Sequence, residues 1–417
     1  MRPSRFAAPF IISIAALTPS LAGCAAPTAA PNIELEWESC DELVKSVAQF
    51  ADMVGAPDVL GEFGDRLECA EVPVPRDHTD PSLGTLTVQI SRLTPEQDSE
   101  GVIFTNPAGP GLEGRTTPAL LAQTGFADLL RTHTLIGIDV RGTGAGGSAR
   151  CANVQMLEVP PGEDSDAQRA KTFAGAVAEA NRDCVAEDVF ARNLTTRSIA
   201  EDLDLVRTAL GLERISYFGQ SWGTELGTQY RSMFPDRLEN ILLDSMTDLH
   251  GDANNSLADI AAAREHFPAV TPEPAGNSAE TYSPLAYGTR TTITCNTAIN
   301  ATDDDENWDA YLQRQRHYLT VGAERIAHPV ASELPGVSAC SGWPLDSTPV
   351  TATARPGTLQ FVAHAQETVT PAVWTEHAQR TVGGNVFTLN DAQHAGLPLS
   401  EAADDAVAFL TADKQME

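Results

Sequence analysis

Lysine is nearly missing from this sequence of 417 residues, which contains only Lys45, Lys171 and Lys414. Arginines supply the other cations, and 57 acidic residues against 27 basic ones give a formal net charge of −30. A chain this acidic repels nucleic-acid phosphates, so we predict no nucleic-acid binding. The charge is typical of a protein that stays soluble outside the cytoplasm.

Long apolar runs are also missing, apart from one near the start. There, Arg2 and Arg5 precede the apolar stretch FAAPFIISIAALTPSLA, which is too short and interrupted for a spanning helix. The following LAGC ends at Cys24 and resembles the bacterial lipobox, whose cysteine is lipidated and begins the mature chain. We expect a signal peptide over 1–23 and a lipidated tether over 24–36 on the outer face of a bacterial cell membrane. The alternative is a soluble secreted protein that is cleaved elsewhere.

No C-x-x-C motif or cluster of His and Cys occurs, so we predict no metal site. After Cys24, the six remaining cysteines are an even number, which indicates disulfides in an exported chain. Many pairings are open; proximity in the sequence suggests Cys40–Cys69, Cys151–Cys184 and Cys295–Cys340.

Short apolar runs alternate with helix-like segments through much of the chain. The patterns predict strands at 85–93, within 101–111, within 132–148, and at 214–218, 238–244, 359–371 and 385–390. They predict helices at 198–211, 222–235, 256–267, 301–319, 372–382 and 399–410. Ser198 and Glu201 have the spacing of a capping box at one helix start. The alternation predicts an α/β fold with a mostly parallel sheet and helices on both faces.

The sequence GQSWG, from Gly219 to Gly223, stands between a predicted strand and a predicted helix. This is the context of a nucleophile elbow, in which Ser221 takes a strained backbone conformation at the tip of a turn. The two glycines are required because side chains there would collide with the neighbouring strand and helix. An ordinary glycine-rich turn is the alternative.

A serine hydroxyl needs a base to act as a nucleophile. The expected chain order is serine, acid, histidine, which favours His394 after the last strand and Glu367 at the end of the strand before it. An oxyanion hole requires two backbone donors, and we expect the N–H groups of Trp222 and Gly109, the latter in NPAGPG.

The motifs NPAGPG, IGIDVRGTGAGGS, GLERISYFGQSWGTELGTQYRSMFPDRLENILLDS, ETVTP and QHAG occur in the order of one family. The chain resembles the secreted tripeptidyl aminopeptidase and proline iminopeptidase group of α/β-hydrolases, particularly actinobacterial lipoprotein members. The resemblance implies an α/β-hydrolase fold, Ser221 as nucleophile, His394 as base, no cofactor, and cleavage of short peptides from a free amino terminus. It also implies that Asp139 and Arg141 support the oxyanion loop.

The chain departs from this family at two positions near the expected site. Glu367 replaces the usual aspartate, and Ala108 stands where the family commonly has glycine. The extra methylene of Glu367 does not exclude activity, because other α/β-hydrolases use glutamate in this role. Ala108 is expected to crowd the oxyanion loop.

The cap region is short in comparison with the family. We expect a hydrolase core over 37–248 and 291–417 with a reduced cap over 249–290, where family members commonly insert a large helical cap that binds the substrate ammonium. Glu113 and Glu225 are candidates for that binding, and each is equally well explained as a surface charge.

The sequence therefore predicts an exported serine hydrolase that releases tripeptides or single residues from peptide N-termini through an acyl-enzyme. An envelope esterase or lipase with the same triad is one alternative. A catalytically silent envelope-binding lipoprotein is another. The expected partners are a peptide substrate and, through the lipid on Cys24, the membrane.

Overall fold

The protein is known from a computed structural model, which describes residues 35–45, 61–144, 166–187, 190–249, 253–267, 284–299, 340–412 and 416. The predicted signal peptide and Cys24, together with Cys151 and the predicted helix 301–319, lie outside the described residues and stay predictions.

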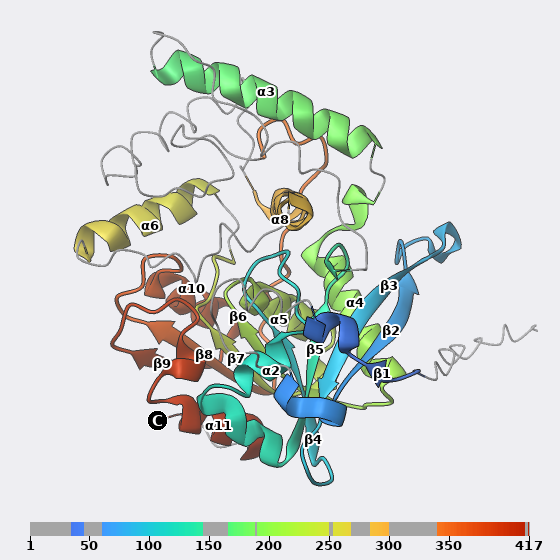
Figure 1. Ribbon diagram of the computed structural model, residues 1–417. Helices are drawn as coiled ribbons and strands as arrows, with labels where there is room; N and C mark the ends of the chain where they lie inside the picture. The colour runs from blue at the N-terminus through green and yellow to red at the C-terminus, as the bar shows by residue number, and fades with distance from the viewer. Residues whose placement is uncertain are drawn as a thin grey trace, which may run out of the picture. The chain divides into compact units, whose positions relative to one another are not determined.

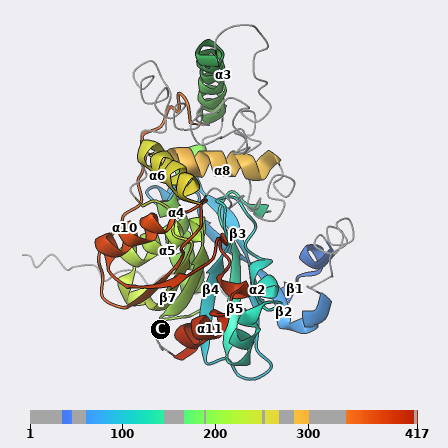
Figure 2. The ribbon, with the colours of Figure 1, turned by 90° about the vertical axis from the view of Figure 1, so that its left-hand side faces the viewer.

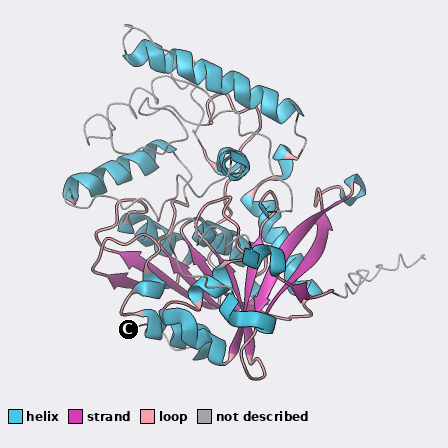
Figure 3. Ribbon diagram, in the orientation of Figure 1, coloured by secondary structure: helices cyan, strands magenta, loops and turns pink. Residues whose placement is uncertain are grey.

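A nine-stranded sheet forms the centre of the described chain, in the order β1-β2-β3-β5-β4-β6-β7-β8-β9. The strands are β1 (Glu38–Ser39), β2 (Leu67–Pro75), β3 (Thr85–Leu93), β4 (Gly101–Asn106), β5 (His133–Asp139), β6 (Ile215–Gln220), β7 (Leu238–Asp244), β8 (Thr358–His364) and β9 (Asn385–Leu389). The three pairs that join β1, β2, β3 and β5 are antiparallel, and the five pairs from β5 to β9 are parallel. The strands are drawn in magenta in Figure 3. The predicted mostly parallel sheet is confirmed.

Helices cover both faces of the sheet (Figure 1). One face packs against α4 (Thr196–Ala209), α5 (Trp222–Met233) and α10 (Ala372–Val382). The other packs against α2 (Thr117–Leu121), η3 (Gly125–Arg131), η10 (Leu397–Leu399) and α11 (Ala403–Ala412). Tyr217 and Phe218 illustrate the division, because these buried neighbours in β6 enter opposite clusters. A central parallel strand buried on both faces reads as a continuous apolar run, as the sequence does here.

Three further helices lie beyond the carboxyl ends of the parallel strands, namely α3 (Asp166–Glu187), α6 (Ala253–His266) and α8 (Pro284–Thr297) (Figures 1 and 2). Residues of α3, α8 and the segment near Trp343 form a small apolar cluster of their own, separate from the two sheet cores. The expected limit between cap and core, at 290 and 291, falls within α8. Helix α3, which the pattern analysis did not predict, belongs to this layer.

Two of the suggested disulfides are confirmed. Cys40 bonds Cys69 between β1 and β2, and Cys295 of α8 bonds Cys340. Cys184 is also disulfide-bonded. Its expected partner, Cys151, lies outside the described residues.

The predicted start of α4 is wrong. The helix begins at Thr196, and its N-cap is Thr195, whose hydroxyl accepts a hydrogen bond from the Ser198 backbone N–H at 3.0 Å. Ser198 therefore lies in the first turn and does not cap the helix. The cap forms at Thr195 because that residue is the last one in extended conformation, with φ −123° and ψ 152°.

Candidate active site

Ser221 is the single residue between the end of β6 and the start of α5. Its backbone has φ 51° and ψ −119°, a conformation that costs energy for a residue with a side chain. Its N–H donates to the Asp244 carbonyl at 2.9 Å, which ties the turn to the end of β7. The turn thus has the strained geometry expected of a nucleophile elbow.

The two flanking glycines are required for steric reasons. A Cβ on Gly219 would run into the Gly223 carbonyl, and one on Gly223 would lie 2.7 Å from the Asn106 carbonyl oxygen. The predicted collisions are therefore confirmed. They also show that the elbow packs against the end of β4, where the NPAGPG loop begins.

The two expected oxyanion donors lie on segments that meet at this contact. Trp222 is the first residue of α5, and the N–H groups of a first turn have no acceptor within their helix. Gly109 lies in the loop after β4 and has φ 144°, a conformation that favours glycine. Their role in binding an oxyanion stays a prediction.

Glu367 and His394 form a close pair. Nδ1 of His394 lies 2.5 Å from Oε1 of Glu367, and the two side chains are 11% and 1% exposed. Since a carboxylate can only accept, Nδ1 carries a proton, and in the neutral imidazole Nε2 therefore has the lone pair. Within the described residues, the Ser221 hydroxyl makes no hydrogen bond to His394; such bonds are often long in hydrolases without substrate.

Glu367 accepts three further hydrogen bonds. The backbone N–H and the hydroxyl of Thr370 donate to Oε1 at 3.1 and 2.5 Å, and the Ser245 hydroxyl donates to Oε2 at 3.0 Å. The carboxylate is therefore fixed on both oxygens. Ser245 also accepts a hydrogen bond from the Ala395 N–H at 2.8 Å, which joins the acid to the segment that carries His394.

Strained backbone is concentrated around these groups. In the described chain, the non-glycine residues with positive φ are Ser221, Ser245 and Ala395, at 51°, 61° and 57°. One is the expected nucleophile, one bonds the acid, and one follows His394. Such strain persists only where the surroundings fix it, and it is frequent at active sites.

The resemblance assigned Asp139 and Arg141 to support of the oxyanion loop. The Asp139 carboxylate accepts from the Arg115 backbone N–H at 3.0 Å and from Arg115 Nε–H at 2.5 Å, so it holds the segment that follows the loop, and its support of the loop itself stays a prediction. Arg141 bonds a different part of the structure. It is fully buried and donates to both carboxylate oxygens of Asp202 at 2.6 Å, so it holds α4.

The two acids considered for ammonium binding differ in environment. Glu113 is exposed. Glu225 lies one turn after Ser221 in α5, is only partly exposed, and accepts a hydrogen bond from the Thr196 hydroxyl at 2.7 Å. Burial raises the pKa of Glu225 to about 7, against smaller opposing effects of the Thr196 and Trp222 side chains.

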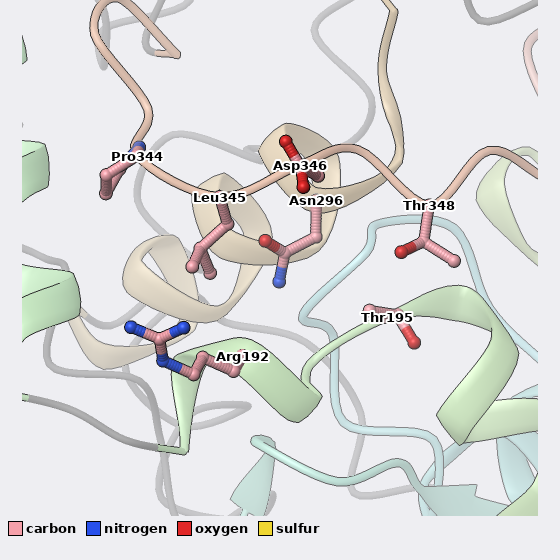
Figure 4. Close-up of a pocket in the computed structure, with 7 residues that line it drawn as sticks. All are labelled: Arg192, Thr195, Asn296, Pro344, Leu345, Asp346 and Thr348. Carbon is pink, nitrogen blue, oxygen red and sulfur yellow. The ribbon is translucent and has the colours of Figure 1, made fainter.

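A polar cavity of about 260 Å³ lies elsewhere, between α8 and the start of α4 (Figure 4). Its lining is Arg192, Thr195, Asn296, Pro344, Leu345, Asp346 and Thr348. None of these is an expected site residue, so this cavity is not the predicted reaction centre. Across the described ranges, no three His, Cys, Asp or Glu side chains gather in a way that would hold a metal ion.

Residues 107–272 match the sequence profile of the family described as alpha/beta hydrolase fold. This segment contains the elbow, and the sheet order and helical layers agree with it. The protein has an α/β-hydrolase fold. The chain is 28% identical over 193 residues to a tripeptidyl aminopeptidase of Streptomyces lividans, an alignment that covers 44% of this chain and 36% of the relative.

Two mycobacterial proteins show a similar degree of identity to this chain. Serine protease Hip1 of Mycobacterium tuberculosis is 27% identical over 190 residues, covering 44% of this chain and 36% of the relative. Carboxylesterase B of the same organism is 30% identical over 191 residues, covering 44% and 34%. The matched segment thus spans little more than a third of the length of these relatives.

Proposed function

We propose that this α/β-hydrolase is an extracytoplasmic serine aminopeptidase that releases tripeptides or single residues from peptide N-termini. The observation that carries the proposal is the Glu367–His394 pair, with Nε2 of the imidazole free to act as a base, in a chain whose strained elbow holds Ser221. The peptidase and protease names of two relatives favour a peptide substrate.

In the proposed reaction, Ser221 Oγ attacks the substrate carbonyl carbon while His394 Nε2 takes the hydroxyl proton. Glu367 holds the ring in the required tautomer and stabilises the imidazolium that forms. The N–H groups of Trp222 and Gly109 bind the tetrahedral oxyanion. His394 then protonates the leaving amine, and a water molecule that it activates hydrolyses the acyl-enzyme.

Disulfides support a location outside the cytoplasm, because they persist in oxidising compartments. In the part of the chain that the structure describes, no helix is both long and apolar enough to cross a bilayer. We propose that attachment to the cell membrane occurs through a lipid on Cys24.

Labelling with a fluorophosphonate tests the nucleophile, and paired substrates test the specificity. We expect the probe to label the protein and Ser221→Ala to abolish labelling. A tripeptidyl anilide with a free amino terminus should be hydrolysed, and its N-acetylated form should be turned over at least about 100-fold more slowly, since a charged hydrogen bond is lost. A well-folded protein that is not labelled would refute the proposal and favour a silent binding protein.

Esterase activity is the second candidate, because one relative of equal similarity is a carboxylesterase. The same triad would serve, since acyl esters and peptides share the attacked carbonyl. Faster hydrolysis of short acyl esters than of anilides, with no effect of blocking the amino terminus, would decide for this candidate.

A further inference from the structure

His364 is a fully buried histidine between two carboxylates, and the proposed reaction does not use it. It is the last residue of β8. Its Nε2 lies 2.9 Å from Oδ1 of Asp244, at the end of β7, and its Nδ1 lies 2.5 Å from Oδ1 of Asp391, just after β9. Because both carboxylates can only accept, both ring nitrogens donate, which requires the imidazolium.

The two carboxylates hold opposite ends of the segment that carries His394. At its start, Asp391 Oδ1 also accepts from the Gln393 N–H at 3.1 Å. At its end, the Leu397 N–H donates to Oδ2 of Asp244 at 3.2 Å. Residues 391–397, here termed the histidine loop, are thus fixed at both ends by groups that His364 joins.

The middle of the histidine loop is held by Gln220, which also contacts Asp244. Gln220, next to the nucleophile, donates from Nε2 to the Ala395 carbonyl at 2.6 Å and contacts Oδ2 of Asp244 at 3.3 Å. The His364 imidazole lies against the histidine loop, since a Cβ on Gly396 would be 3.6 Å from Cε1 of His364. Asp244 therefore joins the elbow, the loop and His364.

We propose that His364 is a positioning residue, which sets the place of His394 by clamping both ends of the histidine loop through Asp244 and Asp391. It does not touch substrate, because its side chain is fully buried. The inference rests on the proposed serine hydrolase reaction. Its physical basis is that a misplacement of about 1 Å far from the chemistry can lower a rate about 100-fold.

The clamp depends on the charge of His364. Burial lowers the pKa of His364, but the hydrogen bonds and charges of Asp244 and then of Asp391 outweigh it and raise the pKa to about 9. These are the titratable groups that face the ring from β7 and from the segment after β9. His394 lies further along the histidine loop and is bonded to Glu367, which follows β8. Above pH 9 the neutral ring can donate to only one of the two carboxylates, so the other loses its hydrogen bond to His364 and the clamp opens.

The test compares His364→Gln and Asp391→Asn with a matched buried histidine, His133→Gln. His133 lies at the amino end of β5, the opposite end of the sheet from the elbow. We expect His364→Gln to lower kcat about 10- to 100-fold with KM within about twofold, and to lower the rate of fluorophosphonate labelling in parallel. His133→Gln should keep kcat within about twofold even where it lowers Tm.

The pH profile separates positioning from mere stability. In the unaltered protein kcat should fall above about pH 9, and in Asp391→Asn this fall should move to lower pH, because one of two charges that stabilise the imidazolium is gone. Asp391 is 34% exposed, so this variant is expected to fold even if His364→Gln does not. Unaltered kcat and pH profile in either folded variant would overturn the clamp. An unlabelled starting protein would overturn the proposed function instead.

Discussion

Glu367 accepts hydrogen bonds from other groups besides His394. Two hydrogen bonds from Thr370 and one from Ser245 fix both carboxylate oxygens, so the side chain has one orientation. The extra methylene relative to aspartate is thus accommodated by contacts from Ser245, just after β7, and from Thr370, just before α10. The carboxylate that orients the His394 imidazole is therefore itself held in place.

Glu367→Gln should lower kcat/KM on the order of 10³- to 10⁴-fold, because an amide can donate to Nδ1 and favour the wrong tautomer. Glu367→Asp keeps the charge but cannot reach His394, Thr370 and Ser245 together, so we expect a smaller loss of about tenfold or more. Steady-state kinetics on a tripeptidyl anilide measure both. A Gln variant as active as the starting protein would contradict the role of the acid.

Glu225 is suited to bind a cation, because in the described chain its carboxylate accepts a hydrogen bond from the uncharged Thr196 hydroxyl and burial raises its pKa to about 7. Above pH 7 it is charged, and below about pH 8 an α-ammonium is also charged. We therefore expect KM for substrates with a free amino terminus to fall as the pH rises through 7.

Glu225→Gln should remove this pH dependence and raise KM for such substrates about tenfold, while short acyl esters are hydrolysed within twofold of the normal rate. Glu113→Gln, at the exposed candidate, is the matched control and should change neither value. A normal KM profile in Glu225→Gln would exclude ammonium binding at this position.

Among the elements, the junction of β6 and α5 has little steric freedom. Gly223→Ala places a methyl group 2.7 Å from the Asn106 carbonyl, so α5 or the loop after β4 must shift. We expect a loss of about 1–3 kcal/mol in unfolding free energy and at least about a tenfold loss of activity. Thermal unfolding and anilide hydrolysis measure the two effects.

Gly175→Ala is the control for that prediction. Gly175 lies within α3, and a Cβ there would have no neighbour within 4 Å. Alanine has the higher helix propensity, so Tm should stay equal or rise slightly. Equal behaviour of the two alanine variants would show that the elbow is not sterically constrained.

The pattern of the sequence predicts those elements that pack on the central sheet. Strands 85–93 and 238–244 and helix 372–382 have the bounds that were predicted. Their apolar residues are close in sequence and follow one period, so the signal is local. Helix α3 was missed because its partners, at Cys295 and beyond Cys340, are distant in the chain.

The same distinction applies to the site. Ser221 could be found from the glycines around it, and the order of serine, acid and histidine then indicated Glu367 and His394. Ser245 and His364 carry no such motif. Their positions follow from contacts between the ends of β7 and β8 and the histidine loop, which only the folded chain brings together.

At the scale of the whole molecule, the disulfide Cys295–Cys340 fastens α8 to the chain that leads back to β8. Replacing both cysteines by serine should reduce the stability of this layer by about 4 kcal/mol, the chain-entropy value for a loop of 45 residues. Hydrogen exchange should then rise in 284–297 while the sheet stays protected. The Cys40–Cys69 pair, changed in the same way, is the control and should leave exchange in α8 unaltered.

Strand β2 lies next to the short β1 at one border of the sheet, where the disulfide Cys40–Cys69 holds the two together. A border strand normally offers its free backbone groups to any passing chain, which leads to aggregation. Here β1 pairs with Glu68 and Cys69 of β2. Further along β2, Pro73 and Pro75 have no amide hydrogen to donate. This border is therefore a poor template for addition of another molecule, a useful property at the location outside the cytoplasm that we propose, where cytoplasmic chaperones are absent.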